Sequence, residues 1–220
     1  MTFISDSLNR IKPSATMVIT AKATQLKSEG KKVIGLSSGE PDFDTPQHVK
    51  QAAIDAINNG YTKYTNIEGI PELRQSIVEK FKKDNDLNYD VSNVIVGTGG
   101  KQILFNALMS SLNKDDEVII PAPYWVSYPD MTLLAGGKPI FVDCSSETNF
   151  KLTGEALEKV ITKNSKWLIL NSPSNPTGSC YSISELEEIA NVVRKHENLY
   201  VMTDDIYEYI VYDNFKFYTL

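Results

Sequence analysis

Short continuous apolar runs alternate with segments of helical periodicity in the second half of the chain. Two such runs, at residues 167–170 and 199–202, are each followed by polar residues. Uncharged runs of this length are typical of strands that are buried on both faces of a parallel sheet. Between them, Ser184 and Glu187 form a capping-box pattern at the start of a helix whose apolar positions are Leu186, Ile189, Ala190 and Val193. The pattern predicts a βαβ unit.

This predicted unit brings three polar side chains to one edge of a sheet. Asn175 lies in the turn-rich loop that follows the first strand, and Asp204 and Tyr207 follow the second strand. Parallel strands end at the same edge, and open α/β sheets bind their ligands outside the carboxyl ends of their strands. We therefore expect a ligand site where these three residues meet.

The rest of the chain also alternates between strand and helix patterns, which predicts the α/β class. Strands are expected at residues 33–36, 94–96, 117–120 and 138–143. Helices are expected at residues 14–29, 46–58 and 153–163, from the glycine turn near residue 100 to residue 112, and from Pro71 onward with Leu73, Ile77 and Phe81 on its buried face. Thr45 is expected to cap the second helix, with Pro46 at its first position, and Thr153 to cap the helix at 153–163.

A glycine turn at residues 97–100 links the strand at 94–96 to the helix that follows. Glycines let backbone crowd an anion, and the free N–H groups at a helix start favour negative charge, so we expect a phosphate there. The pattern is neither a complete G-x-G-x-x-G nor a G-x-x-x-x-G-K-[ST] motif. A nicotinamide-binding fold is the competing interpretation. Against it, no acidic residue ends a second strand about 20 residues later, because Glu117 begins its strand.

Composition narrows the class of protein further. The 220 residues are 41% hydrophobic and 23% charged, which is typical of a globular chain. The net charge of −6 argues against a nucleic-acid partner held through its phosphates. Cys144 and Cys180 make no disulfide framework and favour a reducing, cytoplasmic location. The first residues do not have the pattern of a signal peptide, and no apolar run is long enough to span a membrane.

Two motifs in the βαβ unit resemble a known family. Asn171-Ser-Pro-Ser-Asn-Pro-Thr-Gly178, followed by Thr203-Asp-Asp-Ile-Tyr207, is similar to segments of the class I pyridoxal-phosphate (PLP) aminotransferases of fold type I, in the aspartate or aspartate/prephenate aminotransferase group. The resemblance implies a three-layer α/β/α major domain with a mostly parallel sheet at residues 46–220. Residues 1–45 would form an N-terminal arm and part of a small domain.

The resemblance also implies roles around the ring of the cofactor. Asp204 would lie beside the pyridine nitrogen, where a carboxylate favours the protonated ring that accepts charge from a substrate carbanion. Asn175 and Tyr207 would hydrogen-bond the 3′ oxygen. Trp125, in Pro-Tyr-Trp after the strand at 117–120, would stack on the ring, although a tryptophan is more often a core residue on general grounds.

Further roles concern the phosphate. The resemblance places it on the amides of Gly99, Gly100 and Lys101. Tyr64, in a Tyr-x-x-x-x-Gly-x-x-x-Leu-Arg motif, would reach the phosphate of the partner subunit in a homodimer. The alternative for Tyr64 is a packed loop aromatic.

The substrate-binding residues that the resemblance implies are Gly39, Lys101, Trp125 and Asn175. Gly39 begins a Gly-Glu-Pro-Asp motif, in which the glycine lets backbone approach the carboxylate of the substrate; the alternative is a solvated turn. Lys101 would bind the distal carboxylate of the substrate; the alternative is a solvated lysine at a helix start. No metal site is expected.

The implied activity is transamination between an amino acid, of the aspartate or glutamate type, and a 2-oxo acid. In the family the Schiff-base lysine lies in a Ser-x-x-Lys segment beyond the Asp-x-x-Tyr motif, and no lysine of this chain sits in such a segment. We therefore expect a C-terminally truncated copy that has an incomplete sheet and is inactive alone. The alternative is a non-catalytic remnant, or a dimer partner that lends Tyr64 to a full-length subunit. A nicotinamide-dependent dehydrogenase ranks last.

Overall fold

The computed structural model describes residues 3–36, 39 and 41–220 of the chain, so Ser37, Ser38 and Glu40 of the predicted loop lie outside the described residues. The strands are β1 (Glu117–Ala122), β2 (Lys138–Asp143), β3 (Ser165–Asn171) and β4 (Tyr200–Asp204). The helices are α1 (Ala15–Ser28), α2 (Gln47–Asn58), α3 (Pro71–Asn85), α4 (Gly100–Ser111), α5 (Ser127–Leu134), α6 (Gly154–Val160) and α7 (Ile183–Val193). Three 3₁₀ turns are η1 (Asp6–Arg10), η2 (Val91–Asn93) and η3 (Ser146–Thr148).

The four strands form one parallel sheet in the order β2-β1-β3-β4. Strand β1 lies inside the sheet, and its first four residues are buried, as its continuous apolar run predicts. The predicted βαβ unit is present, since α7 connects the adjacent parallel strands β3 and β4. The α/β class and the parallel sheet are thus confirmed.

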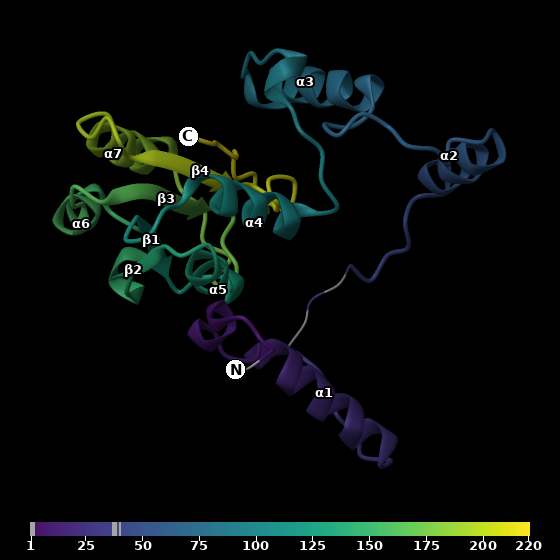
Figure 1. Ribbon diagram of the computed structural model, residues 1–220, viewed down its shortest axis with the longest axis horizontal. Helices are drawn as coiled ribbons and strands as arrows, with labels where there is room; N and C mark the ends of the chain where they lie inside the picture. The colour runs from purple at the N-terminus through teal and green to yellow at the C-terminus, as the bar shows by residue number, and fades with distance from the viewer. Residues whose placement is uncertain (1–2, 37–38, 40) are drawn as a thin grey trace.

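Helices cover both faces of the sheet and create two apolar cores (Figure 1). On one face, Leu157 of α6 and Ile189 of α7 pack with Leu168 of β3. On the other face, Leu108 of α4 and Met131 of α5 pack with strand residues that include Val118, Ile120 and Ile169. Helix α5 was not expected from the sequence. The three layers are therefore α6 and α7, the sheet, and α4 and α5.

The N-terminal helices α1, α2 and α3 lie away from the sheet (Figure 1). No residue of α2 or α3 is buried. The prediction that α3 buries Leu73 is wrong, since that side chain is 43% exposed. The reason is physical: the apolar sides of these helices face no sheet in the part of the chain that the structure describes.

Two predicted strands are absent from the structure. Residues 33–36 and 94–96 are extended but belong to no ladder. Val96 donates its N–H to Glu68 O at 2.9 Å, which is a loop contact. A strand requires a partner, and among the described residues neither stretch forms a ladder with another segment.

Two helix starts differ from their predictions by one or two residues. The capping box of α7 is formed by Ser182 and Glu185, not by Ser184 and Glu187. Pro46 occupies the N-cap of α2 instead of its first turn, so Thr45 does not cap this helix. Thr153 does cap α6, because its side chain accepts a hydrogen bond from the N–H of Ala156 at 3.1 Å.

The sheet places three strand ends together. In the register of β3 and β4, Asn171 is paired with Asp204. Strand β1 ends at Ala122, and the chain then passes through Trp125 into α5.

No helix in the described residues has the length and apolar character that a membrane crossing requires.

Truncating a side chain in the sheet should destabilise the protein much more than truncating one on an outlying helix. Ile119 is fully buried in β1, whereas Ile57 of α2 is 65% exposed. We expect Ile119→Ala to lower the free energy of unfolding by about 2–5 kcal/mol and Ile57→Ala by well under half of that. Urea unfolding followed by circular dichroism measures both. Equal losses would contradict this account of the core.

Candidate active site

An open cavity lies at the carboxyl edge of the sheet, with about 540 Å³ of empty space that is partly open to solvent. Four segments line it: the start of α4, the start of α5, the loop after β3, and the end of β4. The lining residues are Gly100, Lys101, Leu104, Trp125, Tyr128, Asn171, Asn175, Asp204, Ile206 and Tyr207. Six of the eight cofactor residues expected from the sequence are among them.

Asp204 is held from two directions. Its carboxylate Oδ2 accepts a hydrogen bond from the Tyr128 hydroxyl at 2.6 Å. Its backbone carbonyl accepts one from Nδ2 of Asn171, also at 2.6 Å. Asn171 is also linked to Asn175, because its Oδ1 accepts the N–H of Asn175 at 2.7 Å. One network therefore connects the acid at the end of β4 with the amide in the loop after β3.

Tyr128 is one of the lining residues that sequence reasoning missed, with Leu104, Asn171 and Ile206. It is only 2% exposed, and its ring meets that of Trp125 edge-on at a centroid distance of 5.3 Å. Burial, together with the negative charge of Asp204, raises the pKa of Tyr128 well above its usual range, so the hydroxyl stays protonated and donates. The available signal was its spacing of three from Trp125, which sets both side chains on one side of a helical turn.

Trp125 is half-buried and lies under a cation. The Lys101 ammonium is 4.9 Å from the centroid of the Trp125 ring. A cation above the face of an indole is attracted by the quadrupole of the ring. Lys101 is exposed and also lines the cavity, and its role in binding a substrate carboxylate stays a prediction.

The start of α4 leaves room for an anion. No side chain caps this helix, and a Cβ added at Gly99 or Gly100 would meet nothing within 4 Å. Gly99 has a φ of 84°, a conformation that favours glycine. Its own N–H donates to Gly97 O at 3.0 Å, so the first amides of α4, at Gly100 and Lys101, are better placed for an anion than that of Gly99.

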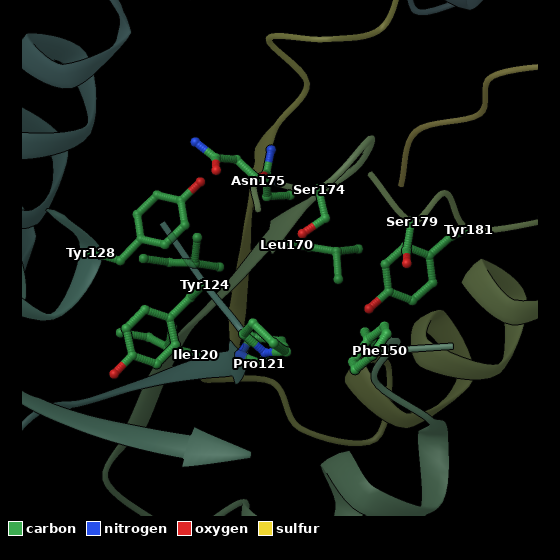
Figure 2. A pocket seen from close by; sticks show the side chains of 13 residues that line it. Ile120, Pro121, Tyr124, Tyr128, Phe150, Leu170, Ser174, Asn175, Ser179 and Tyr181 are labelled. Atoms are coloured by element: carbon green, nitrogen blue, oxygen red, sulfur yellow. The ribbon is translucent and has the colours of Figure 1, made fainter. Parts of the chain in front are cut away.

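Two further spaces adjoin this cavity, which is called the main cavity because Asp204 lines it. Figure 2 shows Tyr124, Tyr128 and Asn175 on one side of a neighbouring cavity, with Phe150 and Tyr181 on the other. An outer hollow is also lined by three residues expected to bind substrate, Gly39, Trp125 and Asn175, together with Tyr207. The fourth, Lys101, lines the main cavity. The residues predicted to bind substrate are thus divided between two adjoining spaces that share Trp125 and Asn175.

Tyr64 is the expected site residue that lies apart. Its side chain is fully exposed, and it lines none of the cavities described above. It is therefore not a packed loop aromatic in this chain.

The raised pKa of Tyr128 has a consequence for alkaline stability. Above pH 10, the ordinary pKa of tyrosine, the unfolded chain loses a proton that the folded chain keeps, so the stabilisation is complete below that pH and is lost as the pH rises. We expect the free energy of unfolding to fall less steeply above pH 10 in Tyr128→Phe, by up to about 1.4 kcal/mol per pH unit. Denaturant titrations between pH 8 and 11 measure this slope.

The exposed Tyr64 provides the matched control. Tyr64→Phe should leave the slope of the wild-type protein unchanged, because a fully exposed hydroxyl has the same surroundings in both states. An unchanged slope in Tyr128→Phe would show that this hydroxyl is not held in its protonated form by the fold.

Comparison with known proteins agrees with this geometry. A probable aspartate/prephenate aminotransferase of Rickettsia bellii is 61% identical over 220 residues, covering 100% of this chain and 55% of the relative. The aspartate/prephenate aminotransferase of Cereibacter sphaeroides is 57% identical over 219 residues, again covering 55% of the relative. The chain thus spans about half the length of the curated relatives it matches.

Solved structures give the same result. The aspartate aminotransferase of Rhizobium meliloti superposes with a TM-score of 0.96 at 48% identity, covering 100% of this chain and 55% of that structure. The Thermus thermophilus enzyme with maleate gives 0.95 at 42% identity, covering 100% of this chain and 57% of that structure. The family model of aminotransferase class I and II matches residues 31–220. The chain therefore belongs to the class I and II aminotransferases.

Proposed function

We propose that the chain serves PLP-dependent transamination, in which an amino group moves between an amino acid of the aspartate or glutamate type and a 2-oxo acid, and that residues 1–220 alone do not complete this reaction. The observation that carries this proposal is the convergence of Asp204, Trp125, Asn175, Tyr207 and the start of α4 on one cavity. Each of these groups suits a different part of PLP. The family assignment and the names of the relatives support the same reaction.

The residues present fit the cofactor in chemistry as well as in position. A carboxylate with one oxygen held by Tyr128 suits a protonated ring nitrogen. An indole beside the cavity suits a flat, electron-poor ring. The uncapped start of α4, with open space at Gly99 and Gly100, suits a phosphate.

Each of these residues would have a separate role toward the bound cofactor. Asp204 would keep the proton on the ring nitrogen, Trp125 would lie against the ring, and Asn175 and Tyr207 would bind the 3′ oxygen. The amides of Gly100 and Lys101 anchor the phosphate. When bound, PLP supplies an electron sink for the negative charge that develops on the α-carbon of the substrate. Asp204 strengthens that sink because its charge stabilises the pyridinium form.

The substrate side of the proposal rests on Lys101 and on the outer hollow. The ammonium of Lys101 above Trp125 is placed to attract the distal carboxylate of an acidic amino donor. Gly39, which lines the outer hollow with Asn175, offers a backbone surface without a side chain to the α-carboxylate. Relatives named for aspartate and prephenate support acidic substrates of this kind.

We also propose that no lysine of residues 1–220 is the Schiff-base lysine. Lys101 is the only lysine that lines the main cavity in the part of the chain described by the structure, and it lies over Trp125. The exposed Tyr64 suits a contribution to the phosphate site of a second subunit, so the active form would be a homodimer. The boundary between an N-terminal arm and a major domain near residue 45 stays a prediction.

The acid at the end of β4 should control the affinity for PLP. Asp204→Asn is expected to weaken PLP binding about 100-fold, because a half-buried partner charge is lost while the shape of the side chain is kept. The quenching of Trp125 fluorescence on titration with PLP measures the affinity.

The neighbouring Asp205 is the matched control. Its carboxylate accepts a hydrogen bond from the Thr219 hydroxyl at 2.6 Å and does not line the main cavity. Asp205→Asn should therefore keep the wild-type affinity. If both variants bind PLP as the wild type does, Asp204 is not the partner of the ring nitrogen.

Borohydride reduction tests the proposal about lysine. We expect the purified 220-residue chain, mixed with PLP and reduced, to carry no stoichiometric covalent label on any lysine and to catalyse no transamination. Peptide mapping by mass spectrometry and an amino-transfer assay provide the two readouts. A stoichiometric label on Lys101 together with turnover would overturn this part of the proposal.

A further inference from the structure

The hydroxyl of Tyr128 has no role in the reaction outlined above, yet it donates a hydrogen bond to the carboxylate of Asp204. The residue is 2% exposed, and its donor distance to Asp204 Oδ2 is 2.6 Å. Its ring belongs to the apolar core of the α4 and α5 layer, where phenylalanine would pack equally well. Burying a hydroxyl is costly unless it is paired, so the polar contact is the feature that distinguishes tyrosine at this position.

This contact restricts the orientation of the Asp204 carboxylate. No other hydrogen bond to that carboxylate is formed within the part of the chain that the structure describes. Rotation of the side chain would break a charge-assisted bond in a half-buried setting. The backbone of the same residue is fixed by Asn171, which donates to its carbonyl. With Oδ2 occupied by Tyr128, Oδ1 is the oxygen left for a ligand in the cavity.

The chemical state of Tyr128 suits this task. Burial and the adjacent negative charge raise its pKa, so it remains a donor throughout the physiological pH range. Its edge-on contact with Trp125 also joins the ring-stacking residue and the acid through one side chain. Removal of the hydroxyl should therefore alter the orientation of the Asp204 carboxylate without removing the aromatic packing.

We propose that Tyr128 is a positioning residue, which orients the carboxylate of Asp204. Because of this orientation, the site binds a ring that has a protonated nitrogen more tightly than a ring of the same shape that has no nitrogen. This inference rests on the proposed PLP function. It predicts that the contribution of Tyr128 appears only when the bound ring offers a nitrogen for Asp204 to meet.

The test compares two ligands in two proteins. PLP and its carba-analogue, in which a C–H replaces the ring nitrogen, are titrated into the wild type and into Tyr128→Phe by fluorescence. We expect the wild type to bind PLP more tightly than the carba-analogue. In Tyr128→Phe the ratio of the two affinities should fall about tenfold, which is the typical contribution of one charge-assisted hydrogen bond. Affinity for the carba-analogue should stay unchanged. An equal loss for both ligands would reduce Tyr128 to a packing residue and overturn the inference.

Tyr181→Phe is the matched control. Tyr181 is also buried, at 4% exposed, and its hydroxyl accepts a hydrogen bond from Leu152 N at 2.8 Å, in the core on the opposite face of the sheet. This variant should lose stability but keep the wild-type preference between the two ligands. A second control is Tyr128→Phe made in Asp204→Asn, where no further change in preference is expected, because the group through which Tyr128 acts is already altered.

A spectroscopic readout makes the inference independent of affinity. The ¹⁵N resonance of the labelled ring nitrogen in bound PLP distinguishes a protonated ring from a neutral one. We expect the wild type and Tyr181→Phe to show the protonated ring, and Tyr128→Phe to shift toward the neutral one, because a carboxylate that Tyr128 no longer orients meets the ring nitrogen less well. An identical resonance in all three proteins would contradict the inference.

The outcomes separate this inference from the function on which it rests. If the wild type does not prefer PLP over the carba-analogue, both the proposed partner of Asp204 and the role of Tyr128 fail. If the wild type has that preference and Tyr128→Phe retains it in full, the proposed function stands and only the positioning role fails.

Discussion

The site depends on the register between β3 and β4. Parallel pairing sets Asn171 opposite Asp204, and the hydrogen bond from the Asn171 side chain to the Asp204 carbonyl closes that pair at the edge of the sheet. A slip of one residue would turn Asp204 to the other face of the sheet, away from Trp125 and α4. The register is in turn held by buried residues such as Leu168 and Ile169, which pack on opposite faces. Apolar burial far from the cavity thus fixes the place of the acid.

The same sheet explains why the burial of apolar side chains differs between the two halves of the chain. The two cores involve elements from α4 onward, whereas α2 and α3 bury no residue and expose apolar side chains such as Ile54 and Leu73. Apolar burial is the main favourable term in folding, so the part that carries the cavity is also the part that is best stabilised. Gly39 and Tyr64, which lie in the outlying part, therefore owe their positions to much weaker contacts than Asp204 does.

Sequence reasoning worked where one local pattern was sufficient. The apolar runs located the two inner strands, β1 and β3, to within a few residues, because a run that is covered on both faces must be apolar throughout. It failed at residues 94–96, since a strand is a property of a pair and the pattern of one segment says nothing about its neighbour. The capping box was misplaced because Ser182-x-x-Glu185 and Ser184-x-x-Glu187 satisfy the same pattern, and only the backbone decides between them. In the site, the motifs identified Asp204 and Trp125, but Tyr128 looked like an ordinary aromatic until its hydroxyl was found against the carboxylate.

The most direct test of the account is a crystal structure of the protein with PLP bound. The account predicts the ring nitrogen within hydrogen-bond distance of Asp204, the ring against Trp125, and the phosphate at the first amides of α4. A cofactor bound elsewhere, or in this cavity with its phosphate toward Asp204 and its nitrogen toward Gly100, would contradict it.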